Sequence, residues 1–151
     1  MSDFVKITNW GFIGCGSVTE IKSGPAYQQT EGFNVYGVMR RDVDKLKDYA
    51  KRHNIDHIYT NADDLINDPN IDAIYIATPP DTHKHYAIKV AAAGKPCCIE
   101  KPLSPSYVDS LAIYQAFEKQ NTPLFVAYYR RSLPRFLKVK EWIDEKYICL
   151  L

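Results

Sequence analysis

Gly14-Cys15-Gly16 is a glycine-rich turn of the kind that can bind phosphate. It follows a short apolar run, Trp10 to Ile13. Ser17 comes next after the turn, and a helix-compatible segment starts at Val18. Glycine suits such a turn because it adopts φ values that a Cβ would penalise and lets the backbone approach a phosphate closely. The helix start adds unpaired N–H groups and the positive end of its dipole. The pattern therefore indicates a strand, a tight turn and a helix that cradle the pyrophosphate of a dinucleotide.

The turn departs from the G-x-G-x-x-G pattern at one position. Thr19 stands where a third glycine or an alanine usually allows close packing of the helix on the strand. Glycine-rich turns after strands are common, so an ordinary structural turn is an equal alternative on these residues alone.

Two arginines follow the second predicted strand, Phe33 to Met39, and they bear on the choice of cofactor. In a dinucleotide site, an acidic residue after this strand accepts hydrogen bonds from the adenosine ribose and favours NAD. Here the position carries Arg40, with Arg41 beside it. A guanidinium cannot accept those bonds, but it can grip a 2′-phosphate bidentately. We therefore expect NADP to bind more tightly than NAD, and Arg40→Asp to reverse the order, unless Asp42 reaches the ribose instead of capping the next helix.

The composition is that of an ordinary globular domain. The chain has 151 residues, 46% hydrophobic and 25% charged, which is enough for one domain with a real core. A net charge of +1 provides no basic field for nucleic acid or an anionic membrane, and no apolar run approaches the ~20 residues that span a bilayer. Because Met1 to Lys6 lack the features of a secretion signal, we expect a cytoplasmic protein.

The four cysteines indicate neither a metal site nor a disulfide. They are Cys15, Cys97, Cys98 and Cys149, with no C-x-x-C pair and no Cys/His spacing typical of zinc. Adjacent Cys97 and Cys98 point to opposite faces if they lie on a strand, so they should not bond each other. We expect both to be buried free thiols, and the backbone of Cys15 to matter more than its sulfur.

Strand and helix signals alternate along the whole chain. This alternation predicts an α/β fold with a doubly wound parallel sheet, in three α/β/α layers, whose ligands bind beyond the carboxyl ends of the strands. The predicted strands are Trp10–Ile13, Phe33–Met39, His57–Tyr59, Asp72–Ala77, Pro96–Ile99 and Leu124–Tyr128, and the predicted helices are Val18–Lys22, Pro25–Gln29, Val43–His53 capped by Asp42, Asp63–Asn67, a helix capped by Asp81 or Thr82 and ending at Ala93, a helix from Ser104 or Ser106 to Gln120, and Leu133–Glu145.

Three further motifs follow the later strands and make the pattern specific. They are Thr78-Pro79-Pro80-Asp81-Thr82-His83, Glu100-Lys101-Pro102, and Tyr128-Tyr129-Arg130-Arg131-x-x-Pro134. Together with the glycine turn, they make residues 6–144 resemble the N-terminal nucleotide-binding Rossmann domain of the Gfo/Idh/MocA oxidoreductase family. The resemblance implies that residues 1–145 form this NAD(P)-binding domain. Family members continue into a second, mostly β-sheet domain, which residues 146–151 do not resemble, so we expect an atypical tail and no second domain.

The resemblance also implies a catalytic role for Lys101. In the family's E-K-P motif the lysine lies beside the nicotinamide and the reacting carbon of the substrate, where an ammonium can stabilise an oxygen whose charge changes as hydride moves. Pro102 commonly follows a cis bond. Glu100 could orient Lys101 or contact a ribose. The alternative for Lys101 is a solvated side chain after a strand, and for Glu100 a carboxylate that only pairs with a neighbour.

The remaining cofactor contacts are implied in the same way. Thr78-Pro79-Pro80 resembles the loop that packs near the adenosine and ribose, and His83 matches the T-P-x-x-x-H histidine that lies near the cofactor. Arg130 could reach the nicotinamide or an acidic substrate group. The alternatives are a strand end for the prolines, a solvent-facing first-turn residue for His83, and a rim ion pair for Arg130.

Three functions remain open on the sequence. The leading one is the cofactor domain of an oxidoreductase that acts on a small-molecule substrate such as a sugar or polyol. The second is a regulatory module that binds the dinucleotide without turnover, although retention of Lys101 favours the enzyme. The third is an inactive remnant. We expect the 151-residue chain alone to bind cofactor without turning over substrate, and to self-associate as a homo-oligomer through apolar surface.

Overall fold

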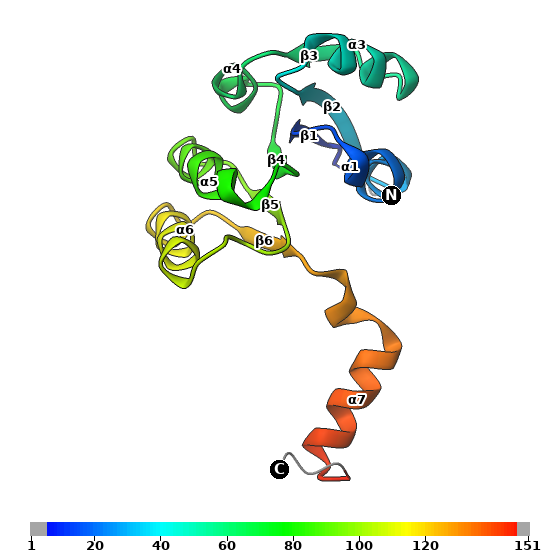
Figure 1. Ribbon diagram of the computed structural model, residues 1–151, viewed down its shortest axis with the longest axis vertical. Coiled ribbons are helices and arrows are strands. Elements are labelled where there is room, and N and C mark those ends of the chain that lie inside the picture. Colours follow the sequence, from blue (N-terminus) through cyan, green and yellow to red (C-terminus); the bar gives the residue numbers. More distant parts are fainter. Residues whose placement is uncertain (1–5, 148–151) are drawn as a thin grey trace, which may run out of the picture.

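The computed structural model describes residues 6–147, and its centre is one sheet of six parallel strands (Figure 1). The strands are β1 Thr8–Ile13, β2 Phe33–Met39, β3 His57–Tyr59, β4 Ala73–Ile76, β5 Cys97–Glu100 and β6 Leu124–Ala127. They lie in the order β3-β2-β1-β4-β5-β6, and every neighbouring pair is parallel. This order is that of the Rossmann fold, so the predicted fold is confirmed.

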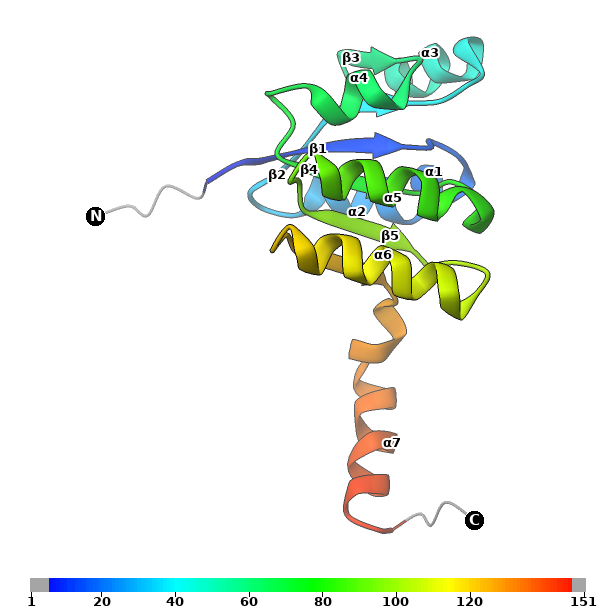
Figure 2. The ribbon, with the colours of Figure 1, turned by 90° about the vertical axis from the view of Figure 1, so that its left-hand side faces the viewer.

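Helices cover both faces of this sheet. Those of residues 6–147 are α1 Ser17–Ile21, α2 Ser23–Gln29, α3 Val43–Arg52, α4 Ala62–Asn67, α5 His83–Ala92, α6 Tyr107–Lys119 and α7 Pro134–Asp144, with short 3-10 helices η1 Pro80–Thr82 and η2 Tyr129–Ser132. The first three α-helices lie on one face and α4 to α6 on the other, which gives the predicted three layers (Figures 1 and 2).

The central strand β4 shows why the layers hold together. All four of its residues are buried. Ile74 and Ile76 pack in a cluster with α4, α5 and α6, whereas Ala73 and Tyr75 pack in a second cluster with α3. Successive side chains on a strand point to opposite faces, so an unbroken apolar run such as this one is stable only between two layers of helices.

The strand ends form one row across the sheet. Ile13 pairs with Met39 of β2 and with Ile76 of β4, and Ile76 pairs in turn with Ile99 of β5. The residues that directly follow Ile13, Met39, Ile76 and Ile99 in the sequence therefore lie at the same carboxyl edge of the sheet. This alignment brings Gly14, Arg40, Ala77 and Glu100 to one edge although they are far apart in the sequence.

The helix caps decide between alternatives that the sequence left open. Asp42 caps α3 as predicted, because its side chain accepts a hydrogen bond from the backbone N–H of Lys45. Ser106 caps α6 by accepting from the N–H of Asp109, whereas Ser104 instead donates to the carbonyl of Ser106. At α5 the N-cap residue is Thr82, one of the two predicted residues, but its side chain accepts no hydrogen bond from the helix. The η1 turn leads directly into that helix, so no side chain accepts at its start.

Two cysteines lie on β5 as expected, on opposite faces of the strand. Cys97 is fully buried against α5 and α6, whereas Cys98 packs toward the other cluster and is only half-buried. Both are free thiols, and burial raises the pKa of each. Cys149 and the rest of residues 148–151, part of the tail predicted from the sequence, lie outside the described residues, as do residues 1–5 of the region searched for a secretion signal.

The last strand and helix of the described chain are the least covered. β6 is an edge strand, and Phe125 on it is 57% exposed. Helix α7 extends away from the sheet (Figure 2), and none of its residues is buried. The expected self-association stays a prediction. No helix within residues 6–147 combines the length and apolarity that crossing a bilayer requires.

Candidate functional site

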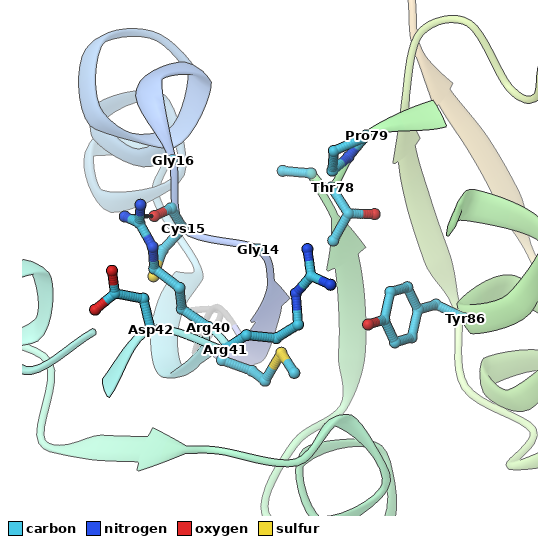
Figure 3. A pocket seen from close by; sticks show the side chains of 11 residues that line it. Gly14, Cys15, Gly16, Arg40, Arg41, Asp42, Thr78, Pro79 and Tyr86 are labelled. Carbon is cyan, nitrogen blue, oxygen red and sulfur yellow. Dashed lines mark hydrogen bonds between the residues drawn. The ribbon is translucent and has the colours of Figure 1, made fainter. Parts of the chain in front are cut away.

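A pocket of about 310 Å³ lies at the carboxyl edge of β1, β2 and β4 (Figure 3). It forms where the chain leaves β1 toward one face and leaves β4 toward the other, the crevice in which doubly wound folds bind ligands. It is lined by Gly14, Cys15, Gly16, Met39, Arg40, Arg41, Asp42, Ala77, Thr78, Pro79 and Tyr86.

The two glycines of the turn serve different purposes. Gly14 has a φ of +91°, and a Cβ there would lie 3.0 Å from the backbone carbon of Ala77, so both conformation and space require glycine. A Cβ on Gly16 would meet no atom within 4 Å. The space above Gly16 is therefore open, and a pyrophosphate that approaches the backbone there fits the turn. The residues present are compatible with a bound dinucleotide.

Thr19, the departure from the glycine pattern, is accommodated inside the fold. Its side chain is fully buried, and its hydroxyl donates to the carbonyl of Gly16 at 2.9 Å. The close approach is made instead at Gly24 of α2, where a Cβ would lie 2.0 Å from the carbonyl oxygen of Thr19. α2 begins at Ser23, two residues before the predicted start, because Pro25 needs no N–H partner in a first turn.

The two arginines differ in how they are used. Arg40 donates from Nη1 to the carbonyl of Cys15 at 2.8 Å, so it braces the glycine turn. The guanidinium of Arg41 extends across the pocket toward Thr78 and Tyr86 (Figure 3). Burial raises the pKa of the Cys15 thiol to about 11, although the Arg40 charge opposes this shift. The thiol therefore stays protonated, and Cys15 contributes its backbone, as expected from the sequence.

Asp42 lines the pocket but is committed to its helix. Its Oδ1 accepts from the backbone N–H of Lys45 at 3.1 Å, and its Oδ2 pairs with the Lys45 ammonium at 3.0 Å. These two interactions hold the pKa of the Asp42 carboxyl below its usual value. Its carboxylate therefore caps α3. Of the two roles that the sequence left open, capping the helix and reaching the ribose, the structure shows the cap.

His83 is fully buried, so the solvent-facing alternative is wrong. Its Nε2 lies 2.8 Å from the carbonyl oxygen of Thr78, and its Nδ1 lies 3.1 Å from that of Pro102 and 3.2 Å from that of Leu103. The role of His83 near the cofactor stays a prediction, since in this structure the ring is buried and both of its nitrogens face backbone carbonyls. The ring lies between the pocket loop at Thr78 and the segment after β5.

Glu100 and Lys101 stand one strand beyond β4, outside the lining of the pocket. At ordinary strand spacing, β5 lies about 10 Å from β1. Lys101 is exposed and is joined to Pro102 by a cis peptide bond. Glu100 accepts a hydrogen bond from the Tyr75 hydroxyl at 2.5 Å and one from the backbone N–H of Lys101 at 3.3 Å.

Other predicted contacts are dispersed. Ser17 and Val18 are exposed at the start of α1, next to the turn, and Pro80 begins η1 beside the pocket loop; none of these three lines the pocket. Arg130 lies in η2 and lines a different hollow, together with Phe136 and Leu137 of α7. The structure therefore does not bring Arg130 to the glycine turn.

Three lining residues were not foreseen: Met39, Ala77 and Tyr86. Met39 and Ala77 adjoin predicted site residues at strand ends, so sequence position alone indicated them. Tyr86 lies three residues after His83 in α5, and the hydroxyl of Tyr86 is directed toward the pocket (Figure 3). The one sequence signal for Tyr86 is its position three residues after the histidine of the T-P-x-x-x-H motif, because residues at that spacing are neighbours on a helix surface. Residues 6–147 hold no group of three or more His, Cys, Asp or Glu side chains placed to bind a metal ion.

Fold, turn and pocket together define a dinucleotide-binding domain of the Rossmann class. A family model described as "Oxidoreductase family, NAD-binding Rossmann fold" (GFO_IDH_MocA) matches residues 8–128. The chain belongs to the Gfo/Idh/MocA oxidoreductase family, and the matched residues are its NAD-binding domain.

Relatives of known sequence agree with this assignment, and a solved structure shares the fold. Oxidoreductase P35 of Formosa agariphila is 44% identical over 140 residues, which are 93% of this chain and 44% of that protein. Myo-inositol 2-dehydrogenase of Thermotoga maritima is 28% identical over 134 residues, 89% of this chain and 40% of that protein. The fold matches scyllo-inositol dehydrogenase from Lactobacillus casei with a TM-score of 0.85 at 19% identity, over 95% of this chain and 43% of that one. The chain spans less than half the length of these relatives.

Proposed function

We propose that this chain binds a nicotinamide dinucleotide in the pocket at the glycine turn, and that it does so as the cofactor domain of an oxidoreductase. The observation that carries the proposal is the open space over Gly16, next to the positive-φ residue Gly14, at the carboxyl edge of the sheet. The turn and the N–H groups at Ser17 and Val18 would receive the pyrophosphate. Thr78-Pro79-Pro80 would form a rigid wall beside the adenosine.

The preferred cofactor in this proposal is NADP. Arg40 and Arg41 both line the pocket, and residues 6–147 place one acidic residue there, Asp42, whose carboxylate is occupied by the cap of α3. A 2′-phosphate gains charge-assisted bonds from a guanidinium, whereas a bare ribose needs an acceptor. Arg41 is the better placed of the two arginines, since Arg40 already donates to Cys15.

The proposed reaction is hydride transfer between the cofactor and a hydroxyl or carbonyl compound, a sugar or polyol by analogy with the inositol dehydrogenase relative. The bound cofactor supplies the hydride chemistry. Lys101 donates a hydrogen bond to the substrate oxygen whose charge changes, and Glu100 fixes the backbone from which Lys101 projects. The small-molecule substrate, the limits of the domain at residues 1–145 and the self-association of the chain are parts of this proposal.

Calorimetric titration of the purified chain with NADP and NAD tests the proposal. We expect saturable binding of both, tighter for NADP, and an affinity about 100-fold lower in Gly16→Val with the fold retained. Gly94→Ala is a matched glycine substitution far from the pocket and should leave binding intact. A folded wild-type chain that binds neither dinucleotide would contradict the proposal.

Turnover is tested separately, by the absorbance of reduced cofactor across a panel of sugars and polyols with wild type and Lys101→Ala. We expect no turnover from the 151-residue chain alone. Turnover of about 1 s⁻¹ or more in wild type would contradict that expectation, and Lys101→Ala should then abolish it while cofactor affinity changes little. Turnover that persists in Lys101→Ala would remove Lys101 from the reaction.

A further inference from the structure

The segment that carries Lys101 has little backbone support of its own. It follows β5 and contains Lys101, Pro102 and Leu103. Outside the helices and strands of residues 6–147, no backbone-to-backbone hydrogen bond involves residues 101–103. Lys101 is also exposed, so packing does not fix its side chain. Side chains from other elements must therefore determine the position of this segment.

Tyr75 holds the segment at its beginning. The Tyr75 side chain is fully buried on β4, and its ring packs edge-on against Phe12 with the ring centroids 5.0 Å apart. Its hydroxyl donates to Oε1 of Glu100, while Oε2 of the same carboxylate accepts from the N–H of Lys101. Burial, followed by the bond to Glu100, raises the pKa of Tyr75, so the hydroxyl keeps its proton. A rigid donor in the core thus orients the carboxylate that binds the Lys101 backbone.

His83 holds the segment at its end. The ring is fully buried at the first turn of α5, and Nδ1 faces the carbonyls of Pro102 and Leu103. Nε2 faces the carbonyl of Thr78, a residue of the cofactor pocket. An imidazole whose N–H is on Nδ1 donates to the carbonyls of the Lys101 segment. The buried ring then lies between that segment and the wall of the pocket at Thr78.

We propose that Tyr75 and His83 are positioning residues for Lys101, which they fix from opposite ends of residues 100–103 at a set distance from the pocket loop. This inference rests on the proposed function, because positioning matters only if Lys101 serves a bound cofactor and substrate. Misplacing a catalytic group by about 1 Å can cost roughly 100-fold in rate. Core residues that bear no reacting atom would then govern how well the exposed lysine works.

The experiment measures backbone order in the free chain by ¹⁵N relaxation, with Tyr75→Phe and two His83 variants. We expect the order parameter of the Lys101 amide to fall in Tyr75→Phe from about 0.85, the value of a rigid backbone, toward about 0.6. His83→Asn keeps a nitrogen donor near the position of Nδ1 and should preserve order at Leu103. His83→Gln keeps one near Nε2 instead and should lose it.

Tyr59→Phe is the matched control. The Tyr59 hydroxyl also donates to a carboxylate, Asp68, at 2.6 Å, but on β3 at the far edge of the sheet. It should lower thermal stability by a similar amount without changing order at Lys101. Unchanged order in Tyr75→Phe and His83→Gln, or an equal loss in Tyr59→Phe, would overturn the inference.

Cofactor titration of the same samples separates this inference from the proposed function. The amide signals of Gly14 and Gly16 should shift on addition of NADP in every variant, with affinities within about threefold of wild type. If those signals do not respond even in wild type, the proposed function fails, whereas order at Lys101 in the free chain still decides the positioning inference. If affinity falls more than about tenfold in Tyr75→Phe, the side chain supports the pocket and not Lys101 alone, which also contradicts the inference.

Discussion

The glycine turn and the Lys101 segment lie at the same sheet edge but are built in opposite ways. The turn works through missing side chains: Gly14 has no room for a Cβ, and Gly16 leaves space for a ligand. The Lys101 segment works through side chains brought from elsewhere, Tyr75 from β4 and His83 from α5. A turn made of glycine is specified within a few residues, whereas the second region depends on the whole sheet. Substitutions should therefore fail differently in the two regions.

The largest expected effect is on stability, from Gly14→Ala. At φ +91° a non-glycine residue is strained by about 1–2 kcal/mol, and the contact of its Cβ with Ala77 adds about 1–3 kcal/mol of overpacking. We expect the free energy of unfolding, measured in urea, to fall by about 3 kcal/mol.

Gly94→Ala is the control for Gly14→Ala. Gly94 also has a positive φ, +67°, but a Cβ there meets no atom within 4 Å. It should show the backbone cost alone, about 1 kcal/mol. Equal losses of unfolding free energy in the two variants would show that the contact of the new Cβ with Ala77 costs nothing.

The next largest effect is on binding, from Gly16→Val. Because a Cβ at Gly16 meets nothing in the protein, the melting temperature should stay near that of wild type. The added side chain would fill the space that the proposed function assigns to the pyrophosphate, so the dissociation constant for NADP should rise about 100-fold, equivalent to roughly 2.7 kcal/mol. Calorimetry of one preparation checks the affinity, and thermal unfolding of the same preparation checks the melting temperature. Unchanged affinity in the folded variant would remove the turn from the site.

A smaller effect separates the two arginines. Arg41→Ser should weaken NADP about tenfold, through loss of one charge-assisted contact, and leave NAD unchanged. Arg40→Asp should reverse the order of the two affinities and weaken both, because a carboxylate cannot donate to the Cys15 carbonyl that Arg40 now binds. Calorimetric titration with both dinucleotides distinguishes these outcomes. Equal affinities that neither substitution changes would refute the proposed NADP preference.

The smallest effect is a dependence of the melting temperature on pH, caused by the Asp42 carboxyl at the pocket. The pKa of Asp42 is lowered in the folded chain by the Lys45 backbone N–H, so its stabilising cap is present above the unfolded pKa of about 4 and is lost as pH falls through the lower folded value. Asp42→Asn, which retains a capping oxygen, should reduce the loss of melting temperature between pH 6 and pH 3. Asp56→Asn, at an exposed carboxyl outside the helices, is the control and should not reduce it.

Much of the fold could be predicted because its signals are local. The bounds of β2 and β3 match the predicted ranges residue for residue, since Gly32 and Arg40 to Asp42 delimit one strand and turn residues delimit the other. The cap position at α5 is Thr82 as predicted, but Pro80 starts a 3-10 turn that leads into the helix, so the Thr82 side chain makes no capping hydrogen bond. Caps at Asp42 and Ser106 depend only on a side chain and an N–H three residues away, so a short window of sequence suffices.

The sequence by itself determined the doubly wound α/β fold class, the glycine turn and the family, because hydrophobic periodicity and glycine conformations are properties of short stretches. It also indicated Lys101, but not what holds it. Only the tertiary structure decided that Arg40 braces the turn while Arg41 faces the pocket, that Tyr86 lines it, and that His83 is buried between two loops. These results depend on which strand ends meet at one edge and on which helix covers them. Hydrogen bonds between residues 19 or 25 positions apart exist only once the sheet has brought those residues together.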